Sequence, residues 1–284
     1  MKKKHLLPAI QSLTLLTVIL LVVIFIRHYE STPKPVDPNQ EQNQVVEGNE
    51  NQDSLENPEA NLEDTNPDEI PDENPEGTPN EEPEKKPLEF VASDKSYFDD
   101  AIIIGDSRTV GIFEYGDMGN MTFYASEGMS IYDIWKEAFP VKGMGTNYLE
   151  TLLKDKDFKK IYIMLGINEL GYDQKQTVTK YKETLDKIHE IKPDAIIYIC
   201  SNLHVTAAQS AKNDIFNNKN IDLFNAEIQK FADQETFFYL ETNQKFNDAS
   251  GNLGTEYTSD NVHILAKYYA EWAEWFCENT IVKE

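Results

Sequence analysis

Two short motifs, about 150 residues apart, carry side chains that could do acyl-transfer chemistry. The stretch IIIGDS ends on Ser107, and a serine at a strand end is a candidate nucleophile once a base removes its proton. His263 could be that base, and Asp260, three residues earlier, could orient the imidazole and stabilise its charged form. The alternative is that Ser259 or Asp260 only caps the helix that follows. The serine motif upstream favours the catalytic interpretation, which predicts a reaction type but no substrate.

The other four histidines are weaker candidates for the base. His5 and His28 lie near the chain start, away from any predicted site, and His189 lies beside a glutamate off the apolar face of a predicted helix. His204 follows a predicted strand. It therefore stays open as an alternative base or as a substrate contact.

The elements that must position these residues alternate between strand and helix. The sequence predicts strands over 101–104, 121–125, 160–165, 195–200 and 236–240, and helices over 109–113, 130–139, 147–154, 177–191, 222–233 and 264–279. Strands separated by helices pair in parallel through crossover connections. Nearly continuous apolar strands fit a sheet that is covered on both faces. The predicted fold class is therefore α/β.

Three residues of chemical interest follow the first three predicted strands, where sites lie in such folds. The backbone N–H of Ser107 is free to donate if a helix begins there. Gly128 could bring a second N–H close to a substrate, because it has no side chain. Asn168 could add a side-chain amide to this oxyanion hole. The alternatives are a turn glycine and a helix N-cap.

Taken in order, these motifs resemble the SGNH/GDSL hydrolase superfamily, which consists of serine esterases on a flavodoxin-like three-layer α/β/α sandwich. The blocks that carry the resemblance are Gly105-Asp106-Ser107, Gly128, Gly166-x-Asn168 and Asp260-x-x-His263. The resemblance implies a mostly parallel five-stranded sheet with Ser107 as the nucleophile. It also implies a triad completed by Asp260 and His263, and an oxyanion hole formed by Ser107, Gly128 and Asn168.

Two positions depart from the superfamily's pattern. Arg108 stands where a leucine usually follows the serine, and Glu169 stands where an aspartate usually follows the asparagine. Arg108 could hold a substrate carboxylate or phosphate in a fork of N–H groups. The alternative is a structural ion pair with Glu169 or Asp106. Arg108, Glu169 and His204 are thus the candidate substrate-binding residues.

The first 29 residues predict a membrane anchor. Residues 6–26 form an uncharged stretch of 21 residues, long enough to cross a hydrocarbon core of about 30 Å as a helix. Three lysines precede it, so we expect a single pass with the N-terminus in the cytoplasm and the rest of the chain outside the cell. A cleaved signal peptide is the alternative, but the residues after the stretch fit a cleavage site poorly.

Residues 30–88 predict a disordered linker. They hold 18 Asp and Glu, only three Lys and 10 of the 13 prolines. Such like charge and low hydrophobicity prevent a packed core. Residues 89–284 are enough for one folded domain.

The composition of that domain limits its partners. It is acidic, so nucleic acid is a poor partner, because phosphate contacts need Lys and Arg. No cluster has the spacing of metal ligands, and neither a metal nor a cofactor is expected. Cys200 and Cys277 are expected to be free, packed thiols. Oligomeric state is not indicated.

The sequence therefore predicts a serine esterase held at the outer face of the cell membrane. O-acetylated cell-wall or surface glycans are the leading substrate class, on the grounds of the tether and family analogy. The alternatives are a lipid acyl-ester hydrolase, an O-acetyltransferase with the same site, and a surface binding module without turnover. A lipase is expected to carry an apolar lid-like segment, whereas 202–220 is polar.

Overall fold

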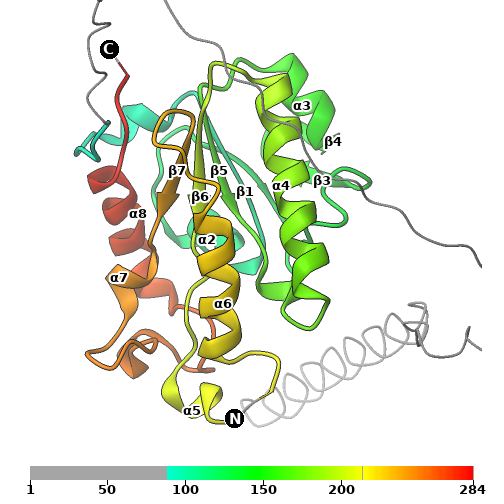
Figure 1. Cartoon of the computed structure of the whole chain (residues 1–284). Helices are drawn as coiled ribbons and strands as arrows, with labels where there is room; N and C mark the ends of the chain where they lie inside the picture. Colours follow the sequence, from blue (N-terminus) through cyan, green and yellow to red (C-terminus); the bar gives the residue numbers. More distant parts are fainter. Residues whose placement is uncertain (1–87, 213, 284) are drawn as a thin grey trace, which may run out of the picture. The chain divides into compact units, whose positions relative to one another are not determined.

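A computed structural model describes residues 88–212 and 214–283 and contains one five-stranded sheet (Figure 1). Its strands are β1 (Ala101–Gly105), β2 (Thr122–Ala125), β5 (Lys160–Met164), β6 (Ile196–Cys200) and β7 (Phe237–Leu240). Their order is β2-β1-β5-β6-β7, and every neighbouring pair is parallel. The predicted parallel sheet is confirmed.

Helices cover both faces of this sheet because successive strand side chains point to opposite sides. In β1, Ile102 and Ile104 pack with α3 (Leu149–Asp155), α4 (Gln174–Ile191) and α6 (Asn218–Gln229). Ile103 points to the other side, toward α2 (Ser107–Tyr115) and α8 (Tyr269–Glu278). All five residues of β1 are buried, as a strand covered on both faces requires.

The prediction of a helix over 130–139 was wrong. That segment forms turns and then β3 (Ala138–Val141), which pairs antiparallel with β4 (Gly145–Tyr148) outside the main sheet. Gly143 and Gly145 lie at φ 75° and 72°, a region that favours glycine, so the chain reverses there. The helix predicted from residue 147 begins at Leu149.

The terminal helix begins later than predicted. The chain passes through a short 3-10 turn, η4 (Ala266–Tyr268), before α8 starts at Tyr269. Asp260 lies nine residues before α8, so it does not cap that helix. The remaining short elements are η1 (Lys95–Phe98), η2 (Ile167–Glu169), α5 (Ala207–Ser210), α7 (Asn243–Phe246) and η3 (Thr255–Tyr257).

The predicted anchor, residues 1–29, and the predicted linker up to residue 87 lie outside the described residues. Within residues 88–212 and 214–283, no helix is long and apolar enough to cross a membrane. Cys200 and Cys277 are both free, as expected.

Candidate active site

Ser107 is held at the junction between β1 and α2. A Cβ on Gly105 would lie 1.9 Å from Thr109 Oγ1 and 2.9 Å from the Met164 carbonyl, so only glycine lets the helix begin this close to the strand. Asp106 caps the helix, since its side chain accepts a hydrogen bond of 2.9 Å from the Arg108 N–H. Ser107 follows as the first helical residue, at the carboxyl edge of the sheet.

The structure brings Ser107, His263 and Asp260 into one chain of hydrogen bonds. Ser107 Oγ lies 3.1 Å from His263 Nε2, and His263 Nδ1 lies 2.8 Å from Asp260 Oδ2. An ionised carboxylate only accepts, so Nδ1 carries the proton and Nε2 is left to accept one from the serine. The His263 and Asp260 side chains are 47% and 54% exposed, so the site is open to solvent.

The surroundings of Asp260 keep its carboxylate ionised. Partial burial raises its pKa, but the backbone N–H groups of His263 and Val262 and the His263 ring outweigh that effect and lower the pKa to about 2. The two backbone groups both donate to Oδ1, at 2.8 and 2.9 Å, which leaves Oδ2 directed at the imidazole. At neutral pH this carboxylate can orient the ring and stabilise its charged form.

The loop that carries His263 is fixed by a contact that sequence reasoning missed. Asn261 has φ 75°, a conformation in which asparagine is the best tolerated residue after glycine. Its carbonyl accepts from the Thr206 N–H at 3.1 Å, and its side-chain oxygen accepts from Thr206 Oγ1 at 2.9 Å. The segment after β6 therefore positions the histidine. Asn261, between the two triad candidates, could have indicated a turn with positive φ. Nothing in the sequence indicated that Thr206 would contact it.

The three N–H groups that the sequence predicts to form an oxyanion hole each have hydrogen-bonding capacity left in the structure. Among the described residues, the backbone N–H groups of Ser107 and Gly128 make no hydrogen bond. Gly128 has φ 71°, and a Cβ there would meet nothing within 4 Å, so the turn is open on that side. The Asn168 amide donates to the Met129 carbonyl at 3.0 Å, and its second N–H remains for a ligand.

Glu169 is buried and has a structural contact. Its carboxylate accepts a hydrogen bond of 2.5 Å from the Ile131 N–H, while Asn168 holds Met129. Both side chains thus tie the turn that contains Gly128 to the end of β5. Burial raises the pKa of Glu169, although the Ile131 N–H opposes this. In this structure Glu169 positions the turn, and only 2% of its surface is exposed.

Arg108 is also buried, with only 1% of its surface exposed. Among the ion pairs within the described residues none includes Arg108, and its two terminal nitrogens have no hydrogen-bond partner there. Burial lowers its pKa, and the nearby Asp106 carboxylate only partly opposes that shift. Burial likewise raises the pKa of Asp106, with Arg108 opposing. Within the described residues the alternative ion pair with Glu169 or Asp106 is absent, and the Arg108 side chain is almost entirely buried.

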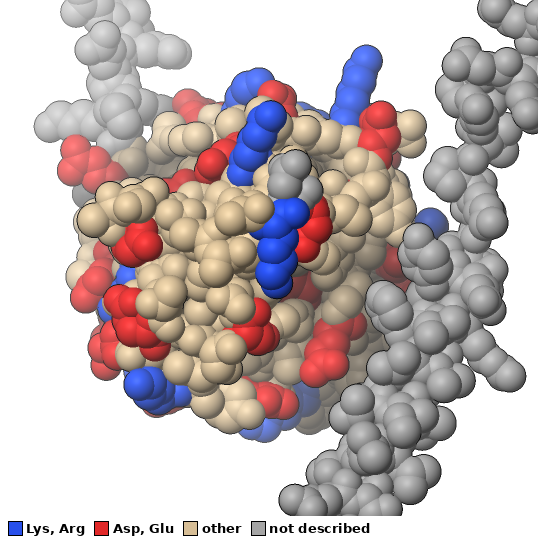
Figure 2. All heavy atoms as spheres, turned by 90° about the horizontal axis from the view of Figure 1, so that it is seen from below, with Lys and Arg blue, Asp and Glu red and all other residues tan. Residues whose placement is uncertain are grey.

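The carboxyl edge of the sheet is the side of the molecule where α5 lies in Figure 1. Figure 2 views the protein from that side and shows acidic and basic side chains interspersed among uncharged ones. On the described residues of this face no continuous basic patch is visible.

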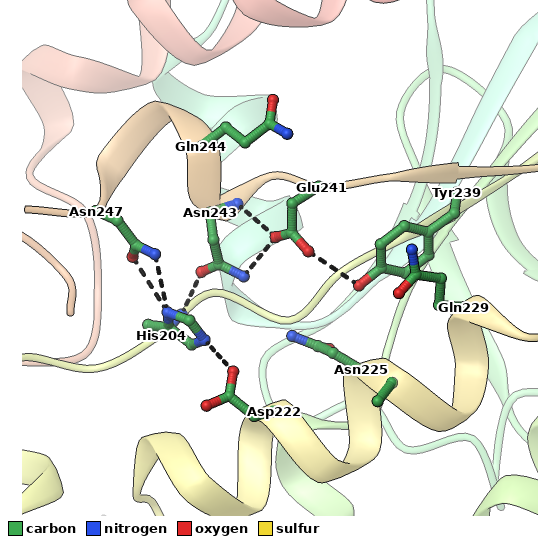
Figure 3. A pocket seen from close by; sticks show the side chains of 10 residues that line it. His204, Asp222, Asn225, Gln229, Tyr239, Glu241, Asn243, Gln244 and Asn247 are labelled. Atoms are coloured by element: carbon green, nitrogen blue, oxygen red, sulfur yellow. Dashed lines mark hydrogen bonds and ion pairs between the residues drawn. The ribbon is translucent and has the colours of Figure 1, made fainter. Parts of the chain in front are cut away.

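His204 lies apart from the triad, in a separate cavity (Figure 3). Its Nε2 lies 2.8 Å from Asp222 Oδ1, and its Nδ1 faces Asn247. Its ring nitrogens therefore do not reach Ser107 in this structure. In the part of the chain that the structure describes, no group of three His, Cys, Asp or Glu side chains could hold a metal ion.

The family follows from a match to a family model over residues 103–270, more than half of the chain. That model describes the GDSL-like lipase/acylhydrolase family, and this chain belongs to it. The superfamily inferred from the sequence motifs is confirmed. The protein is accordingly a serine hydrolase that acts on ester bonds.

Several solved structures resemble this chain at low sequence identity. One is a GDSL-like lipase from Bacteroides thetaiotaomicron, 14% identical with a TM-score of 0.46, over 62% of this chain and 83% of that one. Another is the lipase Lip_vut3 from a goat rumen metagenome, 19% identical with a TM-score of 0.46, over 62% and 94%. A third is a carbohydrate esterase family 3 protein from Talaromyces cellulolyticus, 11% identical with a TM-score of 0.43, over 62% and 92%. No curated protein matches the chain.

Proposed function

We propose that Ser107, His263 and Asp260 form a catalytic triad that hydrolyses an ester. The observation that carries this proposal is the continuous contact from Ser107 Oγ through the imidazole to the Asp260 carboxylate, at 3.1 and 2.8 Å. His263 Nε2 takes the hydroxyl proton as Ser107 Oγ attacks the ester carbonyl carbon. The charge on the carbonyl oxygen is met by N–H donors of Ser107, Gly128 and Asn168.

The second half of the reaction frees the serine. His263 gives its proton to the departing alcohol oxygen as the ester C–O bond breaks, which leaves the acyl group on Ser107. Water then loses a proton to His263 and attacks the acyl carbon, and the serine leaves with that proton. The half-exposed imidazole allows this water to enter.

The proposed substrate is an O-acetyl group on a cell-wall or surface glycan. Support comes from the predicted anchor in residues 6–26 and the acidic linker, which would hold the domain outside the membrane and within reach of the wall. An open triad also suits a small acyl group carried on a large polymer.

One observation favours a second candidate, hydrolysis of longer acyl esters. Ile215 and Phe216 are 49% and 36% exposed, in a segment that looked polar overall. Ile215 packs against Gly171, three residues beyond Asn168, so apolar surface lies near the predicted oxyanion hole. Exposed apolar side chains of this kind could receive an acyl chain.

The test measures acyl release by the full chain, purified in mild detergent, beside its Ser107→Ala variant. The substrates are O-acetylated cell-wall material and p-nitrophenyl esters of increasing acyl length. We expect acetate release from the wall material, a preference for the acetyl ester and a loss of about 10⁶-fold in the variant. A preference for long chains would favour the lipid candidate, and turnover that survives in Ser107→Ala would overturn the triad.

Location is tested separately, by adding protease to intact cells that produce the protein. The predicted topology leaves the domain outside, so the protease is expected to digest it without cell lysis. Protection from the protease until lysis would contradict the outward orientation.

A further inference from the structure

The cavity that contains His204, separate from the triad, has a volume of about 420 Å³ and lies at the carboxyl ends of β6 and β7. It opens on the same edge of the sheet as Ser107, because β1, β6 and β7 are parallel. Its walls come from four segments: the stretch after β6, the helix α6, the end of β7 and the short helix α7 (Figure 3). With strands spaced about 4.8 Å apart, the ends of β1 and β7 are about 14 Å apart. The cavity is thus a separate site within reach of the same polymer.

The inner wall of this cavity is a fixed hydrogen-bond network. Glu241 accepts from Ser201 Oγ at 2.9 Å, from the Asn243 amide at 2.8 Å and from the Tyr239 hydroxyl at 3.2 Å. Asn225 is held against the Asn202 backbone through both its oxygen and its nitrogen, at 2.8 and 2.9 Å. Groups held this way are already ordered, so a ligand would not have to order them.

Almost all of the residues that line the cavity carry hydrogen-bonding side chains. The lining contains two carboxylates, five amides, an imidazole and a phenol, and Ala226 is the single aliphatic side chain. No Lys or Arg is among these lining residues, so an anionic ligand would find two carboxylates and no fixed cation. An acyl chain would leave the polar groups without partners.

Several lining groups keep hydrogen-bonding capacity toward the cavity. Asp222 uses one oxygen for His204 and has a second. Gln229 and Gln244 make no side-chain hydrogen bond within the described residues, and Figure 3 draws none for either. Tyr239 is half-buried and lines the cavity with an aromatic ring and a hydroxyl. Alternating acceptors and donors around one aromatic ring match the hydroxyl groups and C–H face of a sugar.

We propose that this cavity binds a sugar unit that carries no negative charge. Its volume lies in the range of small-ligand sites. Binding a unit here would hold a polysaccharide against the edge on which Ser107 lies. That use of the site rests on the proposed function, whereas the binding itself does not.

The experiment measures binding of chitosan tetrasaccharide and N-acetylchitotetraose to the full chain in mild detergent, by isothermal titration calorimetry, with trigalacturonate as the anionic control. Ala226→Trp fills the cavity from an exposed helix position without removing a hydrogen bond, and Asp222→Ala removes a carboxylate from its rim. Glu227→Ala is the matched control, because it removes a carboxylate from the same helix outside the cavity. Ser107→Ala separates this site from the triad.

We expect one or both uncharged or cationic oligosaccharides to bind saturably and trigalacturonate not to bind. Asp222→Ala is expected to raise Kd by about tenfold or more, the effect of losing a charged hydrogen bond. Ala226→Trp is expected to raise Kd at least as much, because the indole fills the space that the sugar would occupy. Glu227→Ala and Ser107→Ala leave Kd unchanged, and both cavity variants keep turnover of p-nitrophenyl acetate. Equal Kd values in all variants, tighter binding of trigalacturonate or no saturable binding of any oligosaccharide would overturn the site. If the natural chain bound the oligosaccharides but hydrolysed no ester, that result would overturn only the proposed function and not the sugar site.

Discussion

The two carboxylate oxygens of Asp260 make contacts with different roles. Oδ1 closes the turn by accepting from the His263 and Val262 N–H groups, while Oδ2 faces the imidazole. An amide in its place could keep one of these contacts but would favour the wrong proton arrangement on the ring. The proton of His263 is therefore controlled by the same residue that shapes its loop.

This dual role predicts the effect of Asp260→Asn. We expect kcat for p-nitrophenyl acetate to fall by about 10⁴-fold, because the imidazole no longer presents an unprotonated Nε2 to Ser107. Ser259→Ala, at the exposed neighbouring position, is the control and should keep full activity. A loss of less than tenfold in Asp260→Asn would show that the ring is oriented by something else.

The pKa of Asp260 also predicts how stability depends on acid. The folded pKa of about 2 lies below the ordinary value of 3.8, so this carboxylate stabilises the fold above about pH 4. That contribution is lost as the pH falls from 3.8 toward 2, because the unfolded chain takes up the proton first. The side chain is half exposed, so the effect is under about 1 kcal/mol.

The measurement compares the urea unfolding free energy of the natural chain and of Asp260→Asn between pH 5 and pH 2. The difference in favour of the natural chain is expected to shrink across this interval. A difference that stays constant down to pH 2 would mean that the carboxylate contributes nothing to folding.

Asn168 gives a third prediction at this scale. Its amide holds Met129 with one N–H and leaves the other for the carbonyl oxygen of the substrate. Asn168→Ala should lower kcat by about 10²- to 10³-fold, as expected for loss of one oxyanion donor. Asn147→Ala, which removes an amide from the β4 strand, serves as the control for stability and activity. If Asn168→Ala lowers only the melting temperature and not kcat, the amide is purely structural.

At the scale of elements, the shape of the turn after β5 depends on a single glycine. Gly166 has φ 121°, and a Cβ there would lie 2.2 Å from the Phe224 ring of α6. Gly143 has φ 75°, and a Cβ at that position would meet nothing within 4 Å. Both glycines adopt backbone conformations that other residues disfavour, but only Gly166 is also crowded.

The two glycines form a matched pair for substitution by alanine. Gly143→Ala should lower the free energy of unfolding by about 1 kcal/mol, from backbone conformation alone. Gly166→Ala adds overpacking against Phe224 and should lower it by about 3 kcal/mol. Urea unfolding monitored by circular dichroism gives both values, and equal losses would show that the helix α6 yields without strain.

The same scale shows where sequence reasoning succeeded. The five strands are nearly continuous apolar runs, and burial on both faces leaves little freedom in where such runs can go. The segment 130–137 misled because Ile131 and Ile134 are buried three residues apart, a spacing shared by a helix and by successive turns. The glycines at 143 and 145 marked a chain reversal, but not which strands would pair across it.

In the candidate site too, some residues could be recognised from the sequence and the surroundings of others could not. Ser107, Asp260 and His263 were recognisable because their chemistry requires fixed residue types close to strand ends. Arg108 and Glu169 were interpreted as substrate contacts, or as members of an ion pair, because charged residues are rarely buried without partners. Their burial depends on how α2, α8 and the turn at Gly128 pack together, and no local pattern reports that packing.

For the whole molecule, net charge governs which esters approach fastest. The chain carries −24 at neutral pH, and the face in Figure 2 mixes both signs without a continuous basic patch on its described residues. A negatively charged ester should be repelled at low salt. We expect its kcat/KM to rise several-fold between about 10 mM and 300 mM salt, over which the screening length falls from about 30 Å to under 10 Å.

The control for this prediction is p-nitrophenyl acetate, which is neutral and should respond little to salt. Stopped-flow or steady-state rates over a salt series give both dependences. A kcat/KM for the anionic ester that falls with salt would indicate a local cationic path to Ser107 that the surface does not reveal.

The way the domain is closed has a mechanical consequence. Val91 and Thr280 exchange backbone hydrogen bonds of 2.8 and 3.0 Å, so the first and last described segments are joined beside the end of α8. The chain then runs through η1 and along β1 before it reaches Ser107 at the far edge of the sheet. Tension applied through residue 88 would first load this bridge and the neighbouring hydrogen bonds of Ser93 to Cys277 and Thr280. The bridge would yield before the sheet does, and Ser107 would stay in register with its histidine while the bridge opened and closed.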